Sequence, residues 1–286
     1  MPMPYSPSIR RRRLSSELRR LRTQAGLTLA DAAKQAGLGR SNLGKMEQAE
    51  SKTVPAAALD KLLDLYNVHE PQARDAMHAL AQDAKQRGWW SKYKGLFDDD
   101  RALPDFEAEA STIRTFEALC IPGLLQTPEY AHALFEGGRY TSLPEIERRV
   151  AFRMARREVL NRVQPARLRA VLDEAALRRV IGGPETMHAQ LTYLLHMAEM
   201  PHVDVQVIPF QAGSHAGLTA PFAILDFPDP RDSSIVYVGT IAGSVFFEQE
   251  DEVARYNATY GDLQGSALST KQSAVLIKEA ADSLRE

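Results

Sequence analysis

Two short helical patterns, separated by a break at residues 37–39, constrain the start of this chain more than any other feature of its sequence. Residues 29–36 are rich in alanine and favour a short helix, and residues 40–48 resume the helical spacing after the break. Two short helices that meet across a tight turn need a small residue at their contact and a glycine in the turn. Ala33 and Gly37 have the spacing for these roles. The sequence therefore predicts a helix-turn-helix.

Three more helical patterns surround this pair. The first ends at Gly26 and has apolar residues at the spacing of an amphipathic helix, namely Leu14, Leu18, Leu21 and Ala25. The other two begin near Pro55 and Pro71, and proline is well suited to a first helical position. We therefore expect a five-helix domain over residues 10–87, preceded by a flexible arm at residues 1–9.

Several side chains of the helix-turn-helix have expected structural roles. Thr28 and Asp31 resemble a capping box at the start of the first of the two helices, although that motif prefers Glu or Gln at the second position. In the second helix, Leu43 and Met46 are expected to face the core, and Glu47 to face inwards or to brace the helix. The other side of this second helix is then its outer face.

The composition is that of a folded globular protein. Apolar residues make up 44% and charged residues 25% of the 286 positions, without the signature of disorder. No apolar run is long enough to span a membrane, and no export signal is visible. The single cysteine, Cys120, excludes an intramolecular disulfide and a metal–thiolate cluster, which fits the reducing cytoplasm. We expect a cytoplasmic protein without a membrane partner.

The charge is distributed unevenly along the chain. Residues 1–54 hold 11 Lys and Arg against 4 Asp and Glu, whereas the remainder holds 24 against 33. A basic segment joined to an acidic remainder indicates different partners, with the basic segment directed at a polyanion. Charge alone leaves DNA, RNA and anionic lipid open. The helix-turn-helix favours DNA, because in this motif the second helix enters the major groove with its N-terminal part.

The outer face of the second helix carries the candidates for contacts with base edges, which are Arg40, Ser41, Asn42 and Lys45. Arg40 has the fork that matches guanine O6 and N7, Lys45 is expected one turn later on the same side, and Ser41 suits a base or a phosphate. The alternative is a solvated helix face. Thr28 is included in the predicted interface.

A run of basic residues precedes the first helix pattern and consists of Arg10, Arg11, Arg12 and Arg13. We expect these side chains to contact phosphates or to reach into a narrow minor groove, where arginine is favoured. Four adjacent cations at a helix N-terminus oppose the helix dipole, so a nearby anion would relieve them. The alternative is a charged helix start that is exposed to water.

Beyond the helical domain the patterns become mixed. Residues 88–100, which include Gly88-Trp89-Trp90 and three consecutive aspartates, are the expected linker. Helices are predicted at about residues 127–137, 143–163, 184–199, 249–264 and 269–284, and strands at about 112–119, 167–172, 203–209, 222–227 and 234–239. Residues 101–286 are therefore expected to form an α+β domain with a small sheet.

No pattern in this second domain indicates catalysis. Asp173 and Glu174 are adjacent, and the side chains of neighbours diverge on both helices and strands. His215 lies in a glycine-rich loop without the spacing of a nucleophile or metal site, so we expect a structural role for it. Cys120 lies between apolar residues and is expected to be a buried small hydrophobe. We expect no catalytic, cofactor-binding or metal-ligating residue.

The layout of the helix-turn-helix resembles that of the xenobiotic-response-element (Cro/C1-type) regulators, which have a five-helix DNA-binding domain. The matching positions are Leu27, Thr28, Ala33, Gly37, Leu43, Met46 and Glu47. The sequence departs from the family pattern at Leu29, where a phosphate-binding Gln is usual, and at Ala32, where Leu is usual. It also has Gly44 inside the second helix, which costs about 1 kcal/mol of helix preference.

The rest of the chain resembles the domain of unknown function that follows this helix-turn-helix in many actinobacterial regulators of the antitoxin-like type. The resemblance is carried by the segments at residues 88–90, 107–128, 173–178, 183–185, 207–210 and 212–217. It implies transcriptional control of an adjacent gene pair through a small partner protein.

We therefore expect a homodimeric, sequence-specific regulator that binds a double-stranded DNA operator at the nucleoid. A small protein partner or a ligand would control it through residues 101–286. Two alternatives remain open. One is a protein-interaction adaptor with weak DNA binding. The other is a DNA-tethered, hydrolase-like enzyme, which would need a cleft with convergent polar groups and a strongly perturbed pKa.

Overall fold

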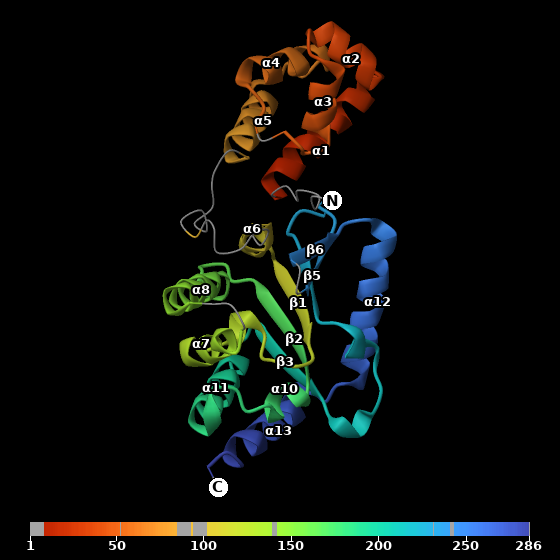
Figure 1. Ribbon diagram of the computed structural model, residues 1–286. Helices are drawn as coiled ribbons and strands as arrows, with labels where there is room; N and C mark the ends of the chain where they lie inside the picture. Colours follow the sequence, from red (N-terminus) through yellow and green to blue (C-terminus); the bar gives the residue numbers. More distant parts are fainter. Residues whose placement is uncertain are drawn as a thin grey trace. The chain divides into compact units, whose positions relative to one another are not determined.

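The computed structural model describes residues 9–51, 53–84, 93, 102–138, 142–230, 232–240 and 243–285. The chain divides into two units, Met1–Ser91 and Lys92–Glu286, and each is described here by itself (Figure 1). The expected arm, apart from Ile9, and the expected linker with its Gly88-Trp89-Trp90, apart from Tyr93, lie outside the described residues. No helix in the described ranges is long and apolar enough to cross a membrane.

The first unit has the expected five helices. They are α1 (Ile9–Gln24), α2 (Leu29–Ala36), α3 (Arg40–Glu47), α4 (Ala56–Leu65) and α5 (Pro71–Asp83). Pro71 takes the first turn of α5, whereas Pro55 is the N-cap of α4, so that helix begins one residue later than its proline. Helices α2 and α3 are short because residues 37–39 separate them, with Gly37 in the left-handed region at φ 65°.

The core of the first unit is a single apolar cluster to which every helix contributes. Its fully buried leucines are Leu14, Leu18, Leu43, Leu59, Leu62 and Leu63. Each of them occupies the inward position that the helical spacing predicts. The residue at the contact of α2 with its neighbours is Ala33, which is 2% exposed, so the small side chain lets the helices approach closely.

The second unit is built on a six-stranded mixed sheet in the order β3-β2-β1-β4-β5-β6. The strands are β1 (Thr112–Glu117), β2 (Arg167–Asp173), β3 (Val203–Ile208), β4 (Phe222–Asp226), β5 (Ile235–Thr240) and β6 (Gly243–Phe247). Strands β1, β2 and β3 are parallel, and β4, β5 and β6 continue the sheet antiparallel. The expected α+β class is confirmed, and β6 is a strand that the sequence patterns did not predict.

Helices cover both faces of this sheet. They are α6 (Ala102–Glu109), α7 (Pro128–Glu136), α8 (Leu143–Arg156), α9 (Glu158–Asn161), α10 (Ala175–Arg178), α11 (Gly183–Ala198), α12 (Glu250–Ser266) and α13 (Thr270–Asp282), with 3-10 turns η2 (Gly123–Leu125), η3 (Phe210–Ala212) and η4 (Ala216–Thr219). Helices α7, α8 and α11 connect the parallel strands and lie on one face, and α12 lies on the other (Figure 1). Crossover connections of one hand require this arrangement.

Strand β1 lies between β2 and β4. Its successive side chains point to opposite faces of the sheet, and the two faces differ in polarity. Phe116 is fully buried in a cluster with Val253, Tyr260 and Leu263 of α12. Residues two apart on a strand share a face. Ile113, Thr115 and Glu117 therefore belong to the opposite face, on the side of α7 and α8.

The packing of η4 onto β1 gives a test of this core. A Cβ atom added at Gly217 would lie 2.3 Å from Cε1 of the buried Phe116 ring. We expect Gly217→Ala to lower the free energy of unfolding by about 1–3 kcal/mol, because the ring has to move inside a packed core. Thermal unfolding followed by circular dichroism measures the change.

A second alanine substitution serves as the control. Gly261 is exposed within α12, and a Cβ atom added there meets no atom within 4 Å. Gly261→Ala should raise the stability by about 0.5–1 kcal/mol, since it removes backbone entropy from the unfolded chain. Shifts of the two variants in the same direction would contradict the packing argument.

Candidate nucleic-acid interface and a pocket in the second unit

Helix α2 is held at its start by a side-chain cap and at its end by a backbone hydrogen bond in the turn to α3. Thr28 is the N-cap of α2, and its hydroxyl accepts a hydrogen bond from the Asp31 amide at 3.2 Å and donates one to the Asp31 carboxylate at 2.6 Å. At the other end, the Leu38 amide donates to the Ala33 carbonyl at 2.8 Å. The cap is half of a capping box, because Asp31 binds the threonine hydroxyl instead of the N-cap amide.

A half-buried ion pair joins α1 to α3. The Arg22 guanidinium contacts the Glu47 carboxylate twice, from Nε at 2.8 Å and from Nη2 at 3.0 Å, and its Nη1 donates to the Leu27 carbonyl at 2.6 Å. The side chains are 14% and 5% exposed. Hydrogen bonding to Glu47 raises the pKa of Arg22. Glu47 thus braces α3, one of the two roles that its position predicted.

The four candidates for base contacts, Arg40, Ser41, Asn42 and Lys45, are all exposed on α3. Leu43 and Met46 are buried, so the helix has one side in the core and one side in solvent. The expectation that Lys45 lies on the same side of the helix as Arg40 is wrong. Five residues correspond to about 140° of rotation, and Lys45 instead lies one turn after Ser41.

Two of the departures from the Cro/C1-type pattern, Leu29 and Ala32, have a structural role. Leu29 packs against the core cluster, and Ala32 is fully buried in it. A Cβ atom added at Gly44 would lie 3.6 Å from Cδ2 of Leu29, which is ordinary van der Waals contact. Leu29 therefore supports the contact between α2 and α3 at the position where the family has a phosphate-binding side chain.

The four arginines at residues 10–13 belong to the start of α1, and each takes part in an interaction within the chain. Successive helix residues differ by about 100° in direction, so the four side chains cannot all face one duplex. Arg10 and Arg13 are three apart and share a side. The expected contacts with phosphates remain a prediction, and we now expect them from only some of the four arginines.

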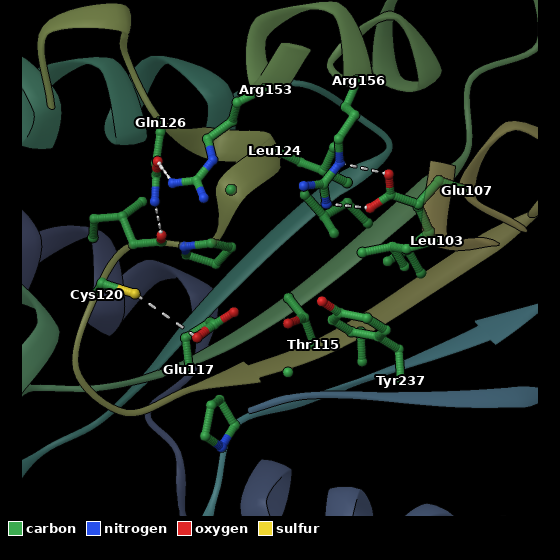
Figure 2. A pocket seen from close by; sticks show the side chains of 18 of the residues that line it. Leu103, Glu107, Thr115, Glu117, Cys120, Leu124, Gln126, Arg153, Arg156 and Tyr237 are labelled. Atoms are coloured by element: carbon green, nitrogen blue, oxygen red, sulfur yellow. Dashed lines mark hydrogen bonds and ion pairs between the residues drawn. The ribbon is translucent and has the colours of Figure 1, made fainter. Parts of the chain in front are cut away.

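A cavity of about 240 Å³ lies in the second unit, on the face of the sheet that carries α7 and α8. Its floor is formed by β1, whose alternation places Ile113, Thr115 and Glu117 along it, with Tyr237 from β5. Arg153 and Arg156, one turn apart on α8, line the other side. Figure 2 shows the two guanidinium groups facing Glu117, Thr115 and Tyr237 across the pocket.

The two arginines of the pocket differ in how their charge is compensated. Arg156 makes two contacts with the Glu107 carboxylate of α6, at 2.8 Å and 2.7 Å. Arg153 donates to the Gln126 side-chain oxygen at 2.6 Å and lies over the Phe135 ring at 4.3 Å. Among the described residues, no carboxylate forms an ion pair with Arg153. Burial, followed by the neighbouring Arg156, lowers the pKa of Arg153 to about 10.

Glu117 is the titratable group at the sheet side of the pocket. Burial raises the pKa of Glu117 to about 7, against the opposing effect of Arg153 and Arg156. The Cys120 thiol lies 3.9 Å from the Glu117 carboxylate. Burial, followed by the charge of Glu117, raises the pKa of Cys120 to about 12.

The expectation for Cys120 is corrected by this geometry. Its side chain lines the pocket and is half-buried, instead of packing in an apolar core. The reason is that the chain turns after β1, so residues 120–124 border the cavity.

His215 is buried beside Asp173, and its expected structural role stays a prediction. Its Nε2 lies 2.9 Å from Asp173, its Nδ1 accepts from the Gly217 amide at 3.3 Å, and its side chain is 2% exposed. Because the amide can only donate, Nε2 carries the hydrogen. Glu174 points elsewhere and binds the Phe210 amide at 2.9 Å, so the adjacent carboxylates diverge as their spacing predicted.

The sequence reasoning missed Glu107, Glu117, Arg153 and Arg156. Two signals were present in the sequence. The spacing of Thr115 and Glu117 puts two polar groups on one face of a strand, and arginines at i and i+3 share one side of a helix. Only the fold shows that this helix covers that face of the sheet.

The brace between α1 and α3 is open to a direct test. Glu47→Gln leaves the half-buried Arg22 without a charged partner, so we expect the first unit to lose about 3 kcal/mol of stability. The double variant Arg22→Met with Glu47→Met should lose less stability than the sum of the losses in the single variants Arg22→Met and Glu47→Met. Glu50→Gln, at an exposed position three residues further on, is the control and should change little. Additive losses in calorimetric unfolding would show that the pair does not act as a brace.

Comparisons with known proteins agree with this division of the chain. A model described as a helix-turn-helix domain matches residues 13–77, which cover most of α1 to α5. A model described as a domain of unknown function, DUF5753, matches residues 100–279 and includes the sheet and the pocket. Comparison with curated proteins and with solved structures gives no match. Because the second model covers more than half of the chain, this protein belongs to the DUF5753 family, with a helix-turn-helix domain at its N-terminal end.

Proposed function

We propose that the chain is a transcriptional regulator of the Cro/C1 type that reads a double-stranded DNA operator with α3. The observation that carries the proposal is the division of this helix into two sides. Leu43 and Met46 are buried, while Arg40, Ser41, Asn42 and Lys45 are exposed. Exposed residues near the start of the second helix are those that reach base edges in this motif.

The charge of the first fifth of the chain supports a nucleic acid as the partner. Residues 1–54 carry seven more basic than acidic residues, 11 against 4. The helical shape favours DNA over RNA, because the major groove of B-form DNA admits an α-helix and that of A-form RNA does not. In this proposal Arg40 and Ser41 contact base edges, and Thr28 and a subset of the arginines at residues 10–13 contact phosphates.

We also propose that the regulator acts as a homodimer in the cytoplasm, at the nucleoid. One recognition helix spans only a few base pairs, so useful specificity requires two half-sites about 34 Å apart. Two basic first units repel each other, and the second unit is large enough to supply an apolar interface. The resemblance to antitoxin-like actinobacterial regulators supports control through this unit by a small protein partner or a ligand.

The pocket is the reason to weigh catalysis as a second candidate. Glu117, with its pKa raised to about 7, has the character of a general acid or base. The only cysteine thiol has a pKa raised to about 12, so it stays protonated near neutral pH and is a poor nucleophile. This argues against a thiol nucleophile and leaves acid–base chemistry at Glu117 as the second candidate. We propose a binding function without catalysis for the second unit, because no activated nucleophile accompanies Glu117 among the described residues of the pocket lining.

The test of base reading uses a duplex selected by the full chain from a random library. Arg40→Ala should cost about 1–3 kcal/mol on the selected duplex and much less on random DNA, because a base contact is lost. Lys45→Ala tests the other side of α3 in the same way. Lys61→Ala, an exposed lysine on α4, makes the same charge change away from α3 and is the control. Titration at one salt concentration measures all three.

Three results would contradict parts of this proposal. Equal losses on selected and random duplexes would place Arg40 and Lys45 on phosphates. A failure to select any sequence, with weak binding to all duplexes, would favour the adaptor. A chain that sediments as a monomer on an operator with a single half-site would exclude the dimer.

A further inference from the structure

We propose that the pocket of the second unit binds a small organic carboxylate, with Arg153 receiving the carboxylate group and the apolar residues of the cavity receiving the remainder. The inference deepens the proposed control by a ligand and rests on that function only for its regulatory consequence. Binding itself requires nothing of the DNA-binding unit.

The first argument is the charge of Arg153. Its contacts are the neutral Gln126 oxygen and the Phe135 ring, and no acidic residue of the described chain pairs with it. The side chain is nevertheless withdrawn from water, which lowers its pKa. Glu117 faces Arg153 across the pocket and attracts it, but no hydrogen bond or ion pair joins the two side chains. A buried guanidinium without a hydrogen-bonded anion is costly, so an anion that enters the pocket gains a charge-assisted hydrogen bond there.

The second argument is that Arg153, and not Arg156, is the arginine of the pocket that can receive an anion. Arg156 is already matched by Glu107 in a two-point contact. A Cβ atom added at Gly123 would lie 3.8 Å from Nε of Arg153 and 3.8 Å from Nη1 of Arg156. A side chain at this position would therefore occupy the space beside both groups, and glycine keeps it clear.

The third argument concerns the size and charge of the ligand. A cavity of about 240 Å³ exceeds the roughly 150 Å³ that holds benzene in an engineered apolar site. Its apolar lining includes Leu103, Ile113, Ile121, Leu124, Leu134 and Leu168. A planar carboxylate matches the fork of one guanidinium. The neighbouring carboxylate of Glu117 disfavours a doubly charged phosphate, so a monoanion fits best.

The position of Glu117 makes the binding depend on pH. The groups around it are Arg153 and Arg156 on α8, Glu107 on α6, Tyr130 on α7, Tyr237 on β5 and Cys120. A carboxylate bound at Arg153 adds a negative charge near Glu117 and disfavours its ionised form. The ligand therefore binds best when Glu117 is protonated, and the affinity falls as the pH rises through the pKa of about 7.

Isothermal titration of the full chain with benzoate tests the site, because benzoate stays ionised between about pH 6 and about pH 8. We expect benzoate to bind, its neutral isostere benzamide to bind at least about tenfold more weakly, and the benzoate affinity to fall about tenfold from about pH 6 to about pH 8. Glu117→Gln should abolish this pH dependence, since the amide does not titrate.

Substitutions on α8 locate the anion. Arg153→Met should weaken benzoate binding by about tenfold or more, and Arg149→Met, which removes an arginine paired with Glu145 on the same helix, should not. If Arg153→Met fails to fold, Arg153→Lys keeps the charge but loses the fork and should weaken benzoate selectively. Binding of benzamide as tight as that of benzoate, or no binding of benzoate at millimolar concentration, overturns the proposal.

The regulatory consequence is measured separately from the site. Benzoate at saturating concentration should change the affinity of the full chain for its selected duplex, because coupling between two sites is reciprocal. Benzoate binding without this change overturns the coupling and leaves the site standing. Loss of duplex binding in Arg40→Ala with benzoate binding intact shows that the two functions fail independently.

Discussion

The withdrawal of arginine side chains from water is the constraint on which both units depend. A guanidinium stays charged when it is buried, so a negative group beside it lowers the cost of its burial. Arg22 meets Glu47 in the first unit, and Arg156 meets Glu107 in the second. Each pair joins segments that are distant in the sequence, α1 with α3 and α6 with α8. Arg153 differs from these two, because its hydrogen bond goes to a neutral amide; Arg157 and Arg162 likewise have only neutral partners among the described residues. The anion site proposed for the pocket rests on this difference between Arg153 and Arg156.

The central strand β1 links the packing of the second unit to its chemistry. Phe116 points into the core beneath α12, while Thr115 and Glu117 border the cavity beneath α8. One face of the strand is therefore stabilised by apolar burial, and the other keeps polar groups that a core would not tolerate. His215 and Gly217 secure the first face, where the Gly217 backbone lies against the Phe116 ring. The rigidity of this layer holds the pocket groups in place.

Much of the secondary structure followed from local patterns. The five helices of the first unit, five of the six strands and most long helices lie where the spacing of apolar residues predicts them. The misses have local causes. Strand β6 is short and begins at Gly243 with little apolar alternation, and α6 lies beside a stretch rich in aspartate. The placement of Lys45 beside Ser41 instead of Arg40 is a matter of helical rotation, which the residue numbers alone would have given.

The sequence by itself determined the helix-turn-helix, its buried and exposed sides, the basic first fifth and the α+β class of the remainder. These properties follow from interactions between residues a few positions apart, where the period of the backbone translates directly into a face. Only the tertiary structure decided the pocket. Glu107, Glu117 and Arg153 lie on three different elements, and their proximity depends on how α6 and α8 pack against the sheet. The raised pKa of Glu117 and the lowered pKa of Arg153 arise from burial, which is a property of the assembled fold and of no single segment.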